Sequence, residues 1–436
     1  MECFFMLLII YFIYLCYALF ISKFDIVSPS VIFFSSFFSM LSLAYYYKDK
    51  LGFNVEYRTF YVLTIAGLIF LLTESLIKRI KENNTRKIIN CDCFDNENIV
   101  LIKEVILKLS IIFLLFSIIV SIIVIIYVNT KNIVNVEWNM RMTEYRELLL
   151  SGRVQYHFFI SQLYKINTAI AYIYTYIFTY NLVVDRNFWR KQGLIIAFVI
   201  GYIILASLYL GGRQPTVELI LSTMVMYIIL LGDNRFKVLK FVMKCVPILF
   251  LLGILFYFSA DLIGRADPDR DILEYLATYF CGGLYSFNLH IDNPAYTEVW
   301  GQSSFSEIYK YLIKFKFLDA SIEDMSYHSF EIYGNTVTIF GRWYEDFGSL
   351  GVYIMTAIVA ASFSWLYYFK VKNTAKGNRL ADILYAKLVM ALILAGYDDR
   401  VRDLISVHSF FICLLICIIY YGYNKYNVFY RIGVVK

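Results

Sequence analysis

The sequence predicts an all-α, polytopic integral membrane protein with about eleven transmembrane helices. Of its 436 residues, 60% are hydrophobic, and the mean hydropathy is +0.63, whereas soluble domains average roughly 45–50% apolar residues. Apolar runs of about 17–24 residues recur along the chain, which is the length that crosses a hydrocarbon core of ~30 Å. Because backbone groups within lipid must be satisfied inside the segment, each run is expected to be a helix.

The predicted spans follow one another without a linker or an internal repeat, so we expect one integral membrane domain over residues 1–436. The first apolar run lacks a basic leader and a small-residue cleavage site, and it therefore predicts a retained span rather than a signal peptide. In chain order the predicted spans are 2–21, 28–47, 59–77, 105–128, 158–182, 193–210, 216–232, 245–260, 348–369, 381–396 and 404–423.

Charged residues form only 17% of the chain and gather between the spans. The basic connections are 78–104, 186–191, 235–244 and 370–379. The positive-inside rule places them in the cytoplasm, with 78–104 as a basic cytoplasmic loop. The net charge of +6 is thus a topology signal, and no basic domain is present to bind nucleic acid.

The remaining connections are expected to face outward, and the stretch 261–347 is the largest of them. It holds fourteen acidic and six basic residues and is the outer loop that is long enough to fold over a site. It also contains an apolar segment from Ile272 to Ile291 that is typical of a helix.

No cofactor or metal motif is apparent. Most of the eight cysteines lie within apolar runs, where they behave as small hydrophobic residues. Cys91 and Cys93 have no histidine nearby to complete a zinc site. We therefore expect no bound metal and no cofactor.

Arg213 follows two glycines between two long apolar runs. A charge near membrane depth is costly without a partner, which favours a functional site. The alternative is an interfacial arginine that extends to the headgroup phosphates.

A second group of arginines follows the span that ends near residue 260. Arg265 and Arg270 are expected at the outer surface, where a planar guanidinium can bind diphosphate oxygens in a bidentate manner. Asp267 and Asp269 have the spacing of a metal pair in sugar-nucleotide enzymes, but nucleotide sugars are cytoplasmic, and the predicted side argues against that interpretation.

The segment 327–351 is the best candidate for an active site. His328, Glu331, Glu345 and Asp346 are able to accept a proton, and Arg342 could stabilise a phosphate. Glu345 and Asp346 alternatively suit the positive end of the following helix.

Two further outer segments have simpler interpretations. The turn 397–403 contains three acids and two arginines, for which internal ion pairing is expected. The segment 137–153, which ends at Arg153, is amphipathic and could lie flat on the outer leaflet.

The Gly211–Gly–Arg213 opening of one span, and the sequence from Gly334 to Gly351 before another, resemble the O-antigen polymerase family (Wzy), the oligosaccharide repeat-unit polymerases. The resemblance covers roughly Leu208 to Phe411. It implies a GT-C-like architecture related to O-antigen ligases. It also implies an inverting, metal-independent glycosyltransferase that moves a growing glycan from undecaprenyl diphosphate to an incoming lipid-linked unit.

The same resemblance implies roles for individual residues. Arg213 and Arg265 would bind the diphosphate and stabilise the leaving group, with Arg342 as the third arginine. His328, Glu331 or Glu345 would activate the acceptor hydroxyl. The remaining candidates for substrate binding are Arg270, Arg153 and Asp346.

The expected location is the bacterial inner membrane, with the active face periplasmic, and the expected partners are a chain-length regulator and a flippase. Two other functions stay open. One is a ligase-like transferase, which would share the donor and the arginines. The other is a flippase or transporter of lipid-linked oligosaccharides, although transporters usually show two related halves and no such symmetry is visible.

Overall fold

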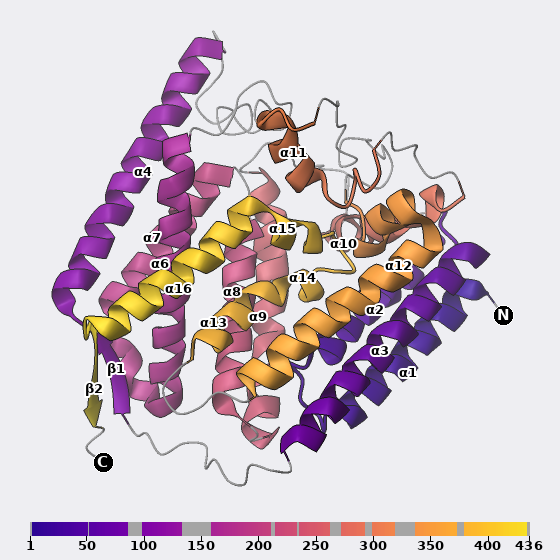
Figure 1. The fold of residues 1–436 in the computed structure, drawn as a ribbon, viewed down its shortest axis with the longest axis horizontal. Helices are drawn as coiled ribbons and strands as arrows, with labels where there is room; N and C mark the ends of the chain where they lie inside the picture. The colour runs from indigo at the N-terminus through magenta and orange to yellow at the C-terminus, as the bar shows by residue number, and fades with distance from the viewer. Residues whose placement is uncertain are drawn as a thin grey trace. The chain divides into compact units, whose positions relative to one another are not determined.

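The computed structural model describes residues 2–50, 52–85, 98–132, 158–210, 214–232, 235–261, 272–292, 299–318, 336–372 and 379–433. It is 82% helical, which confirms the predicted all-α class (Figure 1). Its contacts divide the chain into two compact units. Unit 1 contains residues 1–91, 270–381 and 388–410, and unit 2 contains residues 92–269, 382–387 and 411–436.

Seven helices in the described part of the chain are long and apolar enough to cross a membrane, and all seven coincide with predicted spans. They are α1 (Cys3–Ile21), α2 (Pro29–Tyr46), α3 (Tyr57–Thr85), α4 (Glu104–Asn132), α8 (Gln214–Leu231), α12 (Ile339–Trp365, continued by a π-helix over Leu366–Val371) and α16 (Val407–Lys425). The chain is therefore a polytopic helical membrane protein.

Three further predicted spans are also helical. They are α6 (Phe158–Val184), α7 (Gly193–Leu210) and α9 (Arg235–Asp261). The predicted span 381–396 is not one continuous helix, because α13 (Leu380–Leu388) and α14 (Met390–Ile393) are separate short helices. The two helices are separated by one residue, Val389, whose backbone is itself in the right-handed helical region.

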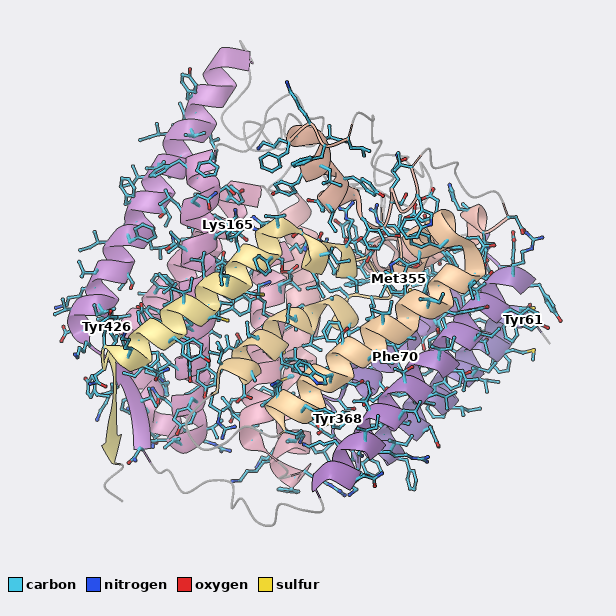
Figure 2. All side chains as sticks on the ribbon, viewed as in Figure 1. Tyr61, Phe70, Lys165, Met355, Tyr368 and Tyr426 are labelled. Atoms are coloured by element: carbon cyan, nitrogen blue, oxygen red, sulfur yellow. The ribbon has the colours of Figure 1, made fainter. Side chains whose placement is uncertain are left out.

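The core of unit 1 is a layer of long helices in which α12 packs along α3 and α1 packs on α2 and α3 (Figure 1). Aromatic side chains fill the interior. Phe33 of α2 stacks on Phe70 of α3 with ring centroids 4.2 Å apart, and Phe340 of α12 lies edge-on to Phe33 at 6.2 Å. Figure 2 labels Phe70 on α3 and Tyr368 on the π-helix that ends α12.

The helix α12 has two halves that meet at Gly348. The backbone there has φ 63° and ψ −163°, a conformation that residues with a Cβ rarely adopt. The first half therefore carries Arg342, Glu345 and Asp346 at a different angle from the apolar second half.

Two connections that were predicted to face outward meet at one end of unit 1. The side chain of Asn288 on α10 (Ile272–His290) accepts from the backbone N–H of Glu56 at 2.9 Å and donates to the carbonyl of Asn54 at 3.1 Å. Arg58 pairs with Asp292 at 2.8 Å. The helix α10 itself confirms the apolar helix expected from Ile272.

The turn between α1 and α2 contacts two of the connections that were predicted to face inward. Asp25, in the turn between α1 and α2, accepts from the Tyr367 hydroxyl at 2.5 Å and pairs with Lys372 at 2.8 Å. Lys78 donates to the carbonyl of Ile21. Lys78 and Lys372, from two connections predicted to face inward, thus both contact the chain near the α1–α2 turn.

Unit 2 contains α4, α6, α7, α8, α9 and most of α16, with a two-stranded antiparallel sheet of β1 (Asn98–Ile102) and β2 (Phe429–Gly433). Asn181 on α6 ties β1 to the helices, because its side chain accepts from the N–H of Val100 at 2.9 Å and donates to the same residue's carbonyl at 2.8 Å. Asn167 donates to the Ser117 hydroxyl at 2.9 Å. Polar groups inside the apolar unit are thus paired across helices.

Candidate functional site

The candidate site lies within unit 1, where α10 and the first half of α12 meet the segment 394–403. Gly283 on α10 makes this approach possible, since a Cβ there would lie 2.7 Å from the carbonyl oxygen of Tyr397 and 3.0 Å from the nitrogen of Thr338. The backbone N–H of Asp399 donates to the carbonyl of Val337 at 2.8 Å. These contacts place polar residues of the two segments side by side.

Arg342 is buried and forms an ion pair with Asp399. The Nε of Arg342 lies 3.6 Å from Oδ2 of Asp399, and the two side chains are 4% and 1% exposed. Burial raises the pKa of Asp399 to about 6, although Arg342 and Arg402 act in the opposite direction. Burial therefore favours the neutral form of Asp399 more than the two arginines favour its charged form.

The turn 397–403 is held together by ion pairs within itself, as predicted. Arg400 pairs with Asp398 at 2.6 Å and with Asp403 at 2.8 Å. The backbone N–H of Arg402 donates to Oδ1 of Asp399 at 3.2 Å, and its Nη1 lies 3.5 Å from the Ser306 hydroxyl. Three arginines, including Arg342, thus share one polar cluster with three aspartates.

Glu345 and Asp346 bind a neighbouring loop of the same unit. Asp346 accepts from the backbone N–H groups of Ser303 at 3.1 Å and of Ser304 at 2.6 Å. Glu345 accepts from the Ser303 hydroxyl at 2.7 Å through Oε2. Both carboxylates lie at the end of the first half of α12, just before Gly348, where the apolar second half begins.

A pocket between α10 and α12 contains a histidine that sequence reasoning missed. It is lined by Ser286, Phe287, His290, Val337, Gly341, Tyr344 and Glu345. It has room for about one water-sized group. The Nδ1 of His290 lies 3.0 Å from the carbonyl oxygen of Ser286, and because a carbonyl only accepts, Nδ1 carries the hydrogen. The signal that could have revealed His290 was its place at the end of the apolar helix predicted from Ile272.

The structure places three of the nine candidate residues on one helix, with Arg342 one turn before Glu345 and Asp346. The other six lie outside the described residues: Arg153, Arg213, Arg265, Arg270, His328 and Glu331. Their predicted roles remain predictions.

Unit 2 contains an intramembrane cation that the sequence reading did not single out. Lys165 on α6 is 8% exposed, and its Nζ lies 5.5 Å from the ring centroid of Phe411 on α16. Figure 2 labels it on its helix. Its position inside an otherwise apolar predicted span was the available signal.

Across the described ranges, no group of three or more His, Cys, Asp or Glu residues is arranged to hold a metal ion. The site instead offers arginines, carboxylates and hydroxyls, which are suited to binding phosphate and hydroxyl groups and to moving a proton. In comparisons with known proteins, no family model, no curated protein and no solved structure matches this chain.

Proposed function

We propose that this protein is a polymerase of lipid-linked oligosaccharide repeat units in the bacterial inner membrane, with about eleven spans, a GT-C-like architecture and a periplasmic active face. It would transfer a growing glycan from undecaprenyl diphosphate to the non-reducing end of an incoming lipid-linked unit.

The observation that carries the proposal is the arrangement of Arg342 and Glu345 one helical turn apart on α12. Arg342 lies in a cluster with Arg400 and Arg402, and Glu345 lines the adjacent pocket. A glycosyl transfer from a lipid diphosphate needs positive charge near the leaving group and one base near the acceptor hydroxyl. Glu345 supplies a candidate base at one end of a helix that is long enough to cross the membrane. Arg342 is paired with Asp399, so the positive charge at the leaving group is expected from Arg213 and Arg265.

The arginines have different expected tasks. Arg342 is buried against Asp399, so its expected task is to hold the segment 397–403 in place beside the site. Arg213 and Arg265 remain the proposed ligands of the diphosphate, by resemblance to the polymerase family. A lipid diphosphate is already an activated leaving group, so positioning and charge stabilisation account for the catalysis that is required.

The test is a gel of the surface lipopolysaccharide from a strain in which this gene is deleted and then restored on a plasmid. Lipid A–core that carries a single repeat unit, with the ladder missing, would support the polymerase. Core without any repeat unit would contradict it and favour a ligase or a flippase. Accumulation of unligated polymer would then single out the ligase.

A further inference from the structure

The pocket between α10 and α12 contains a carboxylate with one oxygen fixed and the other available. Oε2 of Glu345 accepts from the Ser303 hydroxyl at 2.7 Å. Oε1 is buried and has no hydrogen-bond partner within the described part of the chain. A buried carboxylate oxygen without a donor is energetically unfavourable, because it has lost its hydrogen bonds to water without replacement. An arrangement of this kind suits a ligand that supplies the missing donor.

The surroundings of Glu345 restrict what that ligand can be. The pocket admits about one water-sized group, so a whole sugar ring cannot enter. Its wall includes the aromatic rings of Phe287 and Tyr344, whose centroids are 5.8 Å apart in an edge-to-face arrangement. The charge of Arg342 is balanced by its ion pair with Asp399. A neutral hydroxyl on a larger molecule therefore fits the pocket better than an anion does.

We propose that this pocket binds one hydroxyl group of a carbohydrate acceptor, and that Oε1 of Glu345 receives the hydroxyl proton during transfer. As the proton moves to Oε1, the acceptor oxygen forms its bond to the anomeric carbon of the donor. The bond between that carbon and the diphosphate oxygen breaks, and its electron pair leaves with the lipid diphosphate. Ser303 acts as a positioning residue, because its hydroxyl holds the carboxylate in the orientation that exposes Oε1.

This inference rests on the proposed function, and it selects Glu345 among the predicted bases. Ser303 and His290, which the sequence reading did not flag, then belong to the acceptor side of the site. His290 contributes a wall whose orientation is fixed through the carbonyl of Ser286.

The experiment uses the full-length protein in lipid nanodiscs. The donor is the lipid-linked repeat unit isolated from the deletion strain, and the acceptor is a water-soluble glycoside of the same repeat unit, which lacks a diphosphate. Glu345→Gln keeps the size of the side chain but replaces an acceptor atom with a donor. Glu307→Gln is the matched control, because Glu307 forms an exposed pair with Lys310 at 2.8 Å on α11 (Ser306–Lys314).

We expect Glu345→Gln to lower the transfer rate by about 10²-fold or more, the usual effect of a general base, while binding of the lipid-linked donor is unchanged. Ser303→Ala should lower the rate by a smaller factor, and Ser303→Thr, which restores the hydroxyl, should recover it. Transfer by Glu345→Gln at the wild-type rate would overturn the proposal, as would an equal loss of donor binding.

A binding measurement separates this inference from the proposed function. The glycoside alone should raise the melting temperature of the wild-type protein and of Glu307→Gln, but not that of Glu345→Gln. This result would support the pocket even if the wild-type protein transferred nothing and the polymerase proposal failed. Equal stabilisation of wild type and Glu345→Gln, or stabilisation of neither, would show that the pocket holds an ordered water only.

Discussion

Tyr368 donates its hydroxyl hydrogen bond to Oε1 of Glu74 at 2.8 Å, joining the π-helix at the end of α12 to the middle of α3. Oε2 of Glu74 accepts from both the N–H and the hydroxyl of Ser30, each at 2.6 Å. The carboxylate is 3% exposed. Three donors from two other helices thus surround a carboxylate in a predicted membrane span, which is how a polar group inside a membrane is normally satisfied.

Tyr368→Phe should destabilise the protein, because it leaves one oxygen of Glu74 buried without a donor. The expected loss is about 1–3 kcal/mol, the cost of an unsatisfied buried polar group. Thermal unfolding of the detergent-solubilised protein measures it, with Tyr353→Phe on the same helix as the matched control. An unchanged melting temperature for Tyr368→Phe would contradict a stabilising role for the hydrogen bond. Glu74→Ala in the Tyr368→Phe background should then add less than it does alone, because the two residues share one interaction.

Asp399 should make stability depend on pH in an unusual direction. Burial raises its pKa from the ordinary value of 3.8 to about 6 in the folded protein. Between about pH 4 and pH 6 the folded state therefore binds more protons than the unfolded state, and the free energy of unfolding falls as pH rises. The fall should reach about 3 kcal/mol and level off above pH 6, at roughly 1.4 kcal/mol for each pKa unit.

The measurement for Asp399 is the melting temperature of wild type and Asp399→Asn from pH 4 to pH 8. Asparagine resembles the protonated carboxyl, so the melting temperatures of the two proteins should be closest near pH 4. As the pH approaches 6, the melting temperature of wild type should fall relative to that of Asp399→Asn. A difference that is independent of pH would show that Asp399 has an ordinary pKa. Glu307→Gln, at a partly exposed carboxylate paired with Lys310, serves as the control.

The helices could be predicted largely from sequence because lipid imposes a simple rule. The apolar runs at 59–77 and 105–128 had to be helical, and they form α3 and α4. The one-residue interruption between Leu388 and Met390 could not be predicted in this way, since hydropathy reports burial in an apolar medium and not the local hydrogen-bond pattern.

The site was only partly predictable, for a related reason. Glu345 and Asp346 were identified as polar residues before a span, but their partners Ser303 and Ser304 lie about forty residues away, and nothing local specifies that contact. The burial of Asp399 depends on Gly283, which lets two backbones approach closely. Sequence patterns identified the residue types, while the three-dimensional contacts decide which of them share a pocket.

Asp346 should control how firmly the segment around residue 303 is held. Its carboxylate accepts two backbone N–H groups, and hydrogen bonds to a charged group contribute about 1.5–3 kcal/mol each. Asp346→Ala should therefore speed hydrogen exchange at the amides of Ser303 and Ser304 by about tenfold or more, since 1.4 kcal/mol corresponds to a factor of ten. Mass spectrometry of peptides from this segment measures the exchange.

The control for Asp346 is Glu307→Ala, which removes an acid from the neighbouring helix without removing an acceptor of these two amides. Exchange in that variant should match wild type at Ser303 and Ser304. Equal protection in Asp346→Ala and wild type would mean that other contacts hold the segment, such as the packing of Phe305 on Phe347 at 6.2 Å.

Arg213→Ala and Arg265→Ala should each abolish polymerisation while the protein remains inserted in the membrane. Each change removes a positive charge that is proposed to bind the lipid diphosphate in a water-poor site, where an uncompensated phosphate charge is strongly unfavourable. Lysine at either position should restore only part of the activity, because an ammonium group keeps the charge but cannot form the planar, bidentate contact. The length of surface glycan on a gel, with the amount of protein in the membrane fraction measured beside it, is the assay. Arg58→Ala is the control, since Arg58 forms an exposed pair with Asp292. Normal long glycan in both alanine variants would eliminate these two arginines as the diphosphate ligands and would leave the described cluster around Arg342 as the place to look for them.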